Sequence, residues 1–260
     1  MTTLTLFVKA ANPKQLKQVD DLLTADLCDL DLEVTVLGNP VNRWVQVSLS
    51  GEDEPIATNY VTQKIGTCPT NIKNVEKFSV LKGYLSKIDV AKQQLVVDIG
   101  IFEPRVIHAT ISLEYLQAQL ADGRKIELKR LMEVYGFREG LILSVKISGL
   151  SEEVNGDLQA EFSIEQLERI RLWQQSLLDR LIILGASLSE IETMLERARL
   201  NRDIIGTETL GMFEHALTCK LGTDAAGIVS KVGRYMRNSV FIVYNPKKVL
   251  GFIAETALTL

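Results

Sequence analysis

The sequence predicts an α+β protein made of three compact parts. Its 260 residues exceed the usual length of a single domain. Short segments that alternate apolar and polar residues, as strands do, are interspersed with segments whose apolar residues recur every three or four positions, as in helices. The order of these segments divides the chain into residues 1–74, 75–163 and 164–260.

Residues 1–74 are expected to form a small βαββα unit of ferredoxin-like character. "LTLFVK" alternates like a strand, and Asn12 and Pro13 then provide a helix cap and a first helical residue. "LEVTVLG" and "RWVQVSLSG" are predicted strands around a turn at 38–40, and "EDEPIATNYVTQKIG" is a second helix. Cys28, in an apolar helical context, is expected to be buried.

Residues 75–163 are expected to form a five-stranded OB barrel. A hairpin pattern covers 83–100, and a third strand covers 105–113. Two short helical segments follow, ending at Gly123 and Gly136, and two closing strands, 140–150 and 156–163, are joined by the polar turn "SEEVNG". Three strands, a helical interlude and two further strands are the order of an OB barrel.

The middle region also resembles the S-one RNA-binding domain, an OB fold named after a ribosomal protein. The resemblance covers residues 78–163 and is carried by Gly83, "HATISLEYL", and "GLILSVKI" followed by "GDLQAEFS". "GIFEPR" stands where that family has a Gly-Phe-Gly turn, so the loop that faces RNA differs. The resemblance implies an RNA-binding barrel.

Residues 164–260 are expected to form a helical hairpin followed by a small ββαβ unit. Leucine and isoleucine recur at helical spacing over 164–184, and a second amphipathic helix is predicted over 188–200. "DIIGTETL" and "EHALTCK" are predicted strands, "TDAAGIVSKVGRYM" a helix, and "SVFIVY" a last strand before "NPKK".

Composition and motifs argue against several functional classes. No apolar run approaches the roughly 20 residues that span a bilayer, and no signal peptide is evident, so we expect a cytoplasmic protein without membrane contact. The three cysteines are isolated, which predicts neither a metal site nor disulfides. No phosphate-loop or dinucleotide motif occurs, so no cofactor and no small-molecule substrate are predicted.

The segment "EHALTCKLGTDAAG" is the strongest candidate for chemistry. His215 and Cys219 share one face of a predicted strand, and residues two apart on a strand are about 7 Å apart at their bases. His215 and Cys219 are four apart, so a Cys–His nucleophile pair is not expected, and both side chains are interpreted as buried. No catalytic set is recognised, and the protein is not expected to be an enzyme.

Basic residues are concentrated in two regions although the net charge is −4. In the barrel, three residues are candidates for base stacking and six for phosphate contacts; a basic segment near the C-terminus adds six more. The predicted RNA-binding residues are Tyr84, Phe102 and His108 for stacking, and Lys82, Lys87, Arg105, Lys125, Lys129, Arg130, Lys220, Lys231, Arg234, Arg237, Lys247 and Lys248 for phosphates. A solvated charged face is the alternative interpretation.

Residues 214–237 are predicted to fold as a strand, a tight turn and a helix. Gly222 permits the turn, and Thr223 or Asp224 caps the helix. Lys231, Arg234 and Arg237 follow at intervals of three, which places them near one helical face. We therefore expect an anion-binding surface made by Lys220, Lys231, Arg234 and Arg237.

The whole chain resembles an archaeal family catalogued as domain of unknown function 2110. The pattern is "IGIFEPRVIHATISLEYLQAQLADGRK", "RDIIGTETLGMFEHALTCKLGTDAAGIVSKVGRYM" and "VYNPKKV". The order of barrel, helical segment and small α/β unit is also similar to the alpha subunit of translation initiation factor two, which has no counterpart of the N-terminal unit. The family name implies no activity.

Three function classes follow from these observations. The leading hypothesis is a non-enzymatic RNA-binding protein acting in translation or on the ribosome. The alternative is an interaction adaptor on RNA polymerase or another cytosolic complex, favoured by the overall acidity and the two amphipathic helices. An enzyme acting through residues 214–224 is the third class.

Overall fold

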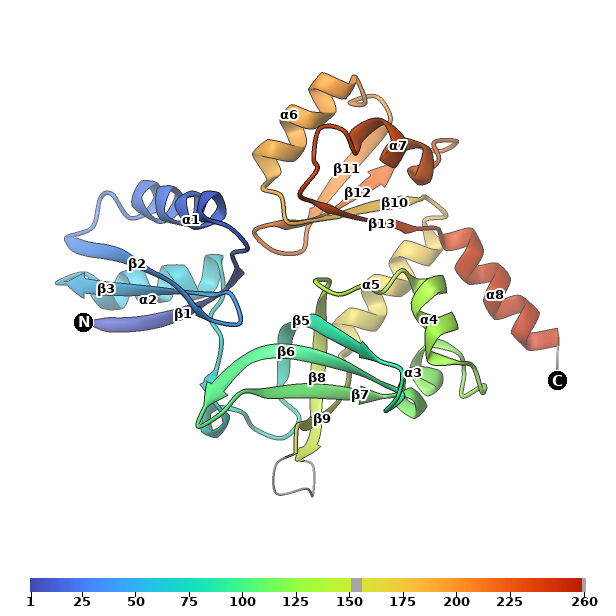
Figure 1. Ribbon diagram of the computed structural model, residues 1–260, viewed down its shortest axis with the longest axis horizontal. Helices are drawn as coiled ribbons and strands as arrows, with labels where there is room; N and C mark the ends of the chain where they lie inside the picture. Colours follow the sequence, from blue (N-terminus) through green and yellow to red (C-terminus); the bar gives the residue numbers. More distant parts are fainter. Residues whose placement is uncertain (151–155, 259–260) are drawn as a thin grey trace. The chain divides into compact units, whose positions relative to one another are not determined.

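The structure is a computed structural model that describes residues 1–150 and 156–258 (Figure 1). Most of the predicted "SEEVNG" turn lies outside the described residues. The chain divides into two compact units: Met1–Val75 with Gly100–Ile107, and Glu76–Ile99 with His108–Leu260. The predicted α+β layout, with a closed barrel and separate small sheets, is confirmed.

The N-terminal part has the predicted βαββα order. Its elements are β1 (Thr2–Lys9), α1 (Pro13–Asp26), β2 (Leu32–Val41), β3 (Trp44–Gly51) and α2 (Glu54–Lys64). The antiparallel sheet has the order β1-β3-β2, and a single bridge from Leu6 to Thr67 continues it beyond β1. The Asn12 side chain accepts a hydrogen bond from the backbone N–H of Gln15 at 3.0 Å, so the predicted cap is confirmed.

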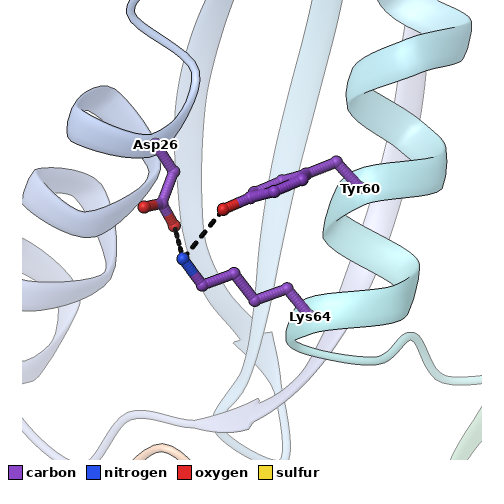
Figure 2. A network of polar contacts seen from close by, with 3 residues as sticks. All are labelled: Asp26, Tyr60 and Lys64. Carbon is purple, nitrogen blue, oxygen red and sulfur yellow. Dashed lines mark hydrogen bonds and ion pairs between the residues drawn. The ribbon is translucent and has the colours of Figure 1, made fainter.

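A polar network joins α1 and α2 (Figure 2). The Lys64 ammonium lies 2.7 Å from the Asp26 carboxylate and 2.8 Å from the Tyr60 hydroxyl. The hydrogen bond to Asp26, followed by that to Tyr60, raises the pKa of Lys64. Because α1 ends at Asp26, Cys28 lies beyond the helix and is exposed, and the prediction that it is buried was wrong.

The central region forms the predicted five-stranded barrel. After β4 (Thr70–Asn71) and a 3₁₀ turn (Ile72–Asn74), its elements are β5 (Val80–Asp89), β6 (Gln94–Glu103), β7 (Ile107–Ser112), α3 (Leu113–Leu120), α4 (Leu128–Tyr135), β8 (Ile142–Leu150) and β9 (Leu158–Phe162). The strand order β6-β5-β8-β9-β7 closes through a pairing of β6 with β7, and β7 and β9 are parallel. This is the connectivity of an OB barrel.

The C-terminal region contains α5 (Ile164–Gln175), β10 (Arg180–Leu184), α6 (Leu188–Ala198), β11 (Ile204–Thr209), β12 (Glu214–Cys219), α7 (Ala225–Val232), β13 (Val240–Tyr244) and α8 (Pro246–Leu258). The predicted helix over 164–184 ends at Gln175, so the expected helical hairpin is not formed. Leu177 adopts φ +54°, outside the helical region, and 180–184 form a strand with every residue buried. A strand buried on both faces has no alternation, which explains the error.

With β10 included, the unit is a complete ferredoxin-like βαββαβ fold rather than ββαβ. The antiparallel sheet has the order β11-β12-β10-β13. Residues of α6 and α7 pack with Leu181, Ile183 and Leu217 to form the core on one face (Figure 1). Among the described helices, none combines the length and the apolar composition that a bilayer span requires.

The other face of this sheet is covered as well. Trp173 of α5 meets Tyr244 of β13 edge to face, with ring centroids 5.2 Å apart. The Tyr84 hydroxyl of the barrel donates to the Glu214 carboxylate at 3.3 Å. Arg180 donates to the Ser176 hydroxyl at 2.9 Å. The strands β10 and β12 are therefore buried almost throughout, whereas the edge strand β11 is mostly exposed.

Candidate nucleic-acid interface

The structure brings three of the predicted phosphate-binding residues together beside the start of α8. The Asn245 side chain accepts from the backbone N–H of Lys248 at 3.0 Å, and Pro246 opens the helix. Lys247 and Lys248 thereby occupy its first turn. Arg130 of α4 lies with them around a hollow of about 730 Å³. We call Arg130, Lys247 and Lys248 the α4–α8 basic surface.

Packing between α4 and α8 positions this surface. The Arg130 guanidinium lies 5.7 Å from the centroid of the Phe252 ring, and Arg124 donates to the Ile253 carbonyl at 2.9 Å. Among the described residues that line the hollow, Glu133 carries the opposing charge, so positive charge prevails. Guanidinium and ammonium groups held together in this way suit phosphate oxygens.

A smaller hollow of about 240 Å³ shares Asn245 and Lys247 with the first. Lys220 lines it too, but so do Asp179 and Asp224, and the charges balance. Asp224 accepts from the backbone N–H groups of Ala226 and Gly227 at 3.2 and 3.0 Å, and Asp179 accepts from the Ala225 N–H at 3.3 Å. Because these carboxylates occupy the start of α7, it is poorly suited to anions.

The predicted strand, turn and helix over 214–237 are confirmed only in part. Gly222 has φ +86°, and α7 follows, but α7 ends at Val232. Arg234 and Arg237 therefore lie beyond the helix, and the predicted helical face shared with Lys231 is not formed. All three side chains are exposed, and Arg234 donates to the neighbouring Tyr235 hydroxyl at 2.8 Å.

The predicted stacking residues of the barrel are divided between the two compact units. Tyr84 is buried against Glu214 and cannot stack on a base in this arrangement. His108 Nδ1 lies 3.8 Å from an Asp157 oxygen. Phe102, together with Arg105, falls within the compact unit of the N-terminal residues.

The remaining predicted lysines of the barrel region are also dispersed. The Lys87 ammonium is 3.0 Å from the Asp89 carboxylate. Lys82 lies on β5, while Lys125 and Lys129 belong to the helical interlude, and all three side chains are exposed.

His215 and Cys219 are buried, as predicted. Burial raises the pKa of the Cys219 thiol to about 11 and lowers the pKa of His215. A thiol with this pKa remains protonated at neutral pH, whereas the thiolate is the nucleophile. No group of three potential metal ligands occurs within the part of the chain that the structure describes.

Sequence reasoning missed two features. The first is Asn245, which caps the N-terminus of α8. The sequence signal for it was the Asn-Pro pair, which is typical of a helix cap followed by the first helical residue. Phe78, flanked by Lys77, is exposed on the barrel. The signal for Phe78 was a lone aromatic residue in the polar segment "VEKFS".

Fold and surface define an α+β protein in which one chain contains an OB barrel and two ferredoxin-like units. The DUF2110 N-terminal domain matches residues 1–71, and the DUF2110 C-terminal domain matches residues 178–244. These matches cover more than half of the chain, which therefore belongs to the DUF2110 family.

No curated protein matches the chain. Among solved structures, the chain is similar to the crystal structure of a provisionally assigned exosome complex RNA-binding protein, at 12% identity. The match covers 71% of this chain and 96% of that one, with a TM-score of 0.24.

Proposed function

We propose that the protein is a non-enzymatic RNA-binding protein acting in translation or on the ribosome. The observation that carries the proposal is the α4–α8 basic surface, in which Arg130 and two lysines of α8 line one hollow. Backbone phosphates are the most abundant anions that RNA presents, and contacts to them give affinity without sequence preference.

The barrel supports RNA as the ligand. OB barrels are a recurrent scaffold for oligonucleotides, and residues 78–163 resemble the S-one RNA-binding domain. The raised pKa of the buried Cys219 thiol argues against nucleophilic chemistry at this position.

The test compares two triple variants with the same change in charge. Arg130→Gln, Lys247→Gln and Lys248→Gln together remove the α4–α8 basic surface. Lys231→Gln, Arg234→Gln and Arg237→Gln remove the exposed cations that the sequence favoured. Fluorescence anisotropy with a labelled single-stranded RNA at several salt concentrations measures affinity and its salt dependence.

We expect the first variant to bind more weakly and to lose about 2 from the slope of log affinity against log salt, since three phosphate contacts disappear. The second variant should change less. No binding by the unmodified protein at low salt would overturn the proposal, and a larger loss in the second variant would move the surface to residues 231–237.

An interaction adaptor is a second candidate, because apolar side chains of α5 are left in solvent. Ile164 is 68% exposed and Leu172 is 63% exposed. Affinity purification with and without nuclease treatment separates the two functions. Partners that survive nuclease favour the adaptor, whereas partners lost with the RNA favour RNA binding.

A further inference from the structure

Phe78 is an exposed aromatic residue in a backbone conformation that ordinary residues avoid. Its side chain is 60% exposed, and its φ is +71°. For a bulky residue this left-handed conformation is strained, and it persists only where the surroundings impose it. Such strain clusters at ligand-binding sites. Neither burial of the side chain nor a favourable backbone conformation therefore explains why a phenylalanine occupies this position.

Hydrogen bonds to β8 fix this position. The backbone N–H of Phe78 donates to the Ile147 carbonyl at 2.7 Å, and the Ile147 N–H donates to the Ser79 carbonyl at 3.0 Å. These two backbone hydrogen bonds attach Phe78 and Ser79 to β8, so the Phe78 side chain is held at the barrel surface. Because the backbone is already held in place, little backbone freedom is lost when a ligand stacks on the ring.

Lysines surround the ring. The Lys77 and Lys146 ammonium groups lie 5.0 and 5.5 Å from its centroid. Val80 pairs with Lys146 across β5 and β8, and Lys82 follows two residues after Val80 on the same outward face. Glu161 contacts Lys146 at 3.2 Å and partly offsets this charge. We call Phe78, Val80, Lys77, Lys82 and Lys146 the Phe78 surface.

We propose that the Phe78 surface is a stacking subsite for an unpaired base of single-stranded RNA. Stacking of bases on aromatic rings next to cations that contact the backbone is how sequence-tolerant single-strand binding works. Cation–π contacts at exposed sites are weak, so Lys77 can exchange the ring for a phosphate. The inference rests on the proposed RNA-binding function and adds a preference for unpaired bases.

The experiment measures base dependence. Unmodified protein, Phe78→Ala and Phe78→Tyr are titrated with a labelled single-stranded RNA, with an abasic strand of the same length, and with an RNA hairpin stem. Phe78→Ala should weaken binding of the single strand by about 5- to 150-fold, as expected for loss of one stacked base. Binding of the abasic strand and the stem should be unchanged, and Phe78→Tyr should retain full affinity.

Equal losses on the base-bearing and abasic strands, or no loss on either, would overturn the stacking subsite. A failure of the stacking subsite can be distinguished from a failure of the proposed RNA-binding function. If the unmodified protein binds RNA and the α4–α8 triple variant weakens binding, while Phe78→Ala does not distinguish the probes, only the subsite fails. If the unmodified protein binds no RNA, both proposals fail.

A direct optical readout provides the second test. Phe78→Trp places an indole on the barrel surface, whereas Trp44 and Trp173 are buried. Single-stranded RNA should quench the added fluorescence, relative to the unmodified protein titrated in parallel, and the abasic strand should not. Equal quenching by both strands would contradict stacking.

Discussion

The N-terminal and C-terminal ferredoxin-like regions share a topology but complete it differently. In the C-terminal region, β13 pairs along the whole of β10 and finishes the sheet. In the N-terminal region the corresponding edge, beside β1, holds only the bridge between Leu6 and Thr67, and the chain then continues into the barrel. The same strand order thus tolerates a complete or a vestigial fourth strand.

The two regions also bury different polar groups. The N-terminal sheet buries the hydroxyl groups of Thr5 and Ser48, which carry no charge. The C-terminal sheet buries Arg180, Glu214 and His215, all of which can ionise. Buried ionisable groups need specific partners and make stability depend on pH. We therefore expect the stability of the C-terminal region to depend more strongly on pH than that of the N-terminal region. It should also depend more strongly on the residues that contact its buried ionisable groups.

The largest expected effect comes from removing the side chain that covers the C-terminal sheet. Trp173 packs on Tyr244, donates to Glu208 at 2.9 Å and lies 5.1 Å from the Arg180 guanidinium. Trp173→Ala should lower the free energy of unfolding by about 3–5 kcal/mol, measured by calorimetry and denaturant titration.

The adjacent Leu172→Ala is the matched control, because Leu172 is mostly exposed and should change little. Trp44→Ala makes the corresponding change in the N-terminal region, and it should affect a different part of the unfolding transition. If Trp173→Ala and Trp44→Ala shift one common transition equally, the two regions unfold as one and the comparison breaks down.

A smaller effect is expected from acid. Burial lowers the pKa of His215, so the unfolded chain binds a proton below about pH 6.5 more readily than the folded chain does. Above about pH 6.5, His215 therefore has no effect on the free energy of unfolding. As the pH falls from there toward the lower pKa of the folded state, His215 reduces this free energy.

His215→Leu should flatten the dependence of the unfolding free energy on pH below about 6.5. Denaturant titrations at a series of pH values measure this slope. His108→Gln is the matched control for loss of a histidine, since His108 is partly exposed. An unchanged slope in His215→Leu would assign the acid sensitivity to other groups.

The smallest effect is expected at the surface of the N-terminal helices. Lys64 is exposed, and its contacts to Asp26 and Tyr60 are accessible to water and salt. Lys64→Met should shift the thermal midpoint only slightly, and added salt should reduce the difference from the unmodified protein. A large shift would show that the network in Figure 2 holds α1 and α2 together.

Much of the fold was predictable because local signals agreed. Alternation, a cap at Asn12 and glycine-ended helices predicted the N-terminal unit and the barrel in order. The prediction failed at 180–184, where β10 is buried on both faces and its apolar run has no period of two. It failed at Cys28 because α1 stops at Asp26, before the apolar pattern does.

The candidate interface was less predictable, because its residues come from distant segments. Arg130 and Lys247 were each candidates, but a single sequence gives no sign that α4 and α8 pack together. Tyr84 alternates as an outward strand residue would, yet it is buried against Glu214 of the C-terminal sheet. Phe78 was not among the predicted binding residues, because a lone aromatic residue is not part of a periodic pattern.

The strand β6 has a consequence for how the chain folds as it is made. Gln94–Ile99 belong to the compact unit of the barrel, while Gly100–Glu103 belong to the N-terminal unit, where Gly100 lies against Cys68 and Trp44. A nascent chain acquires its N-terminal domains first. Because the N-terminal unit includes Gly100–Ile107, we expect it to stay incompletely folded until these residues have left the ribosome. A fragment cut at residue 71, where the N-terminal family match ends, would lack the segment that covers Trp44.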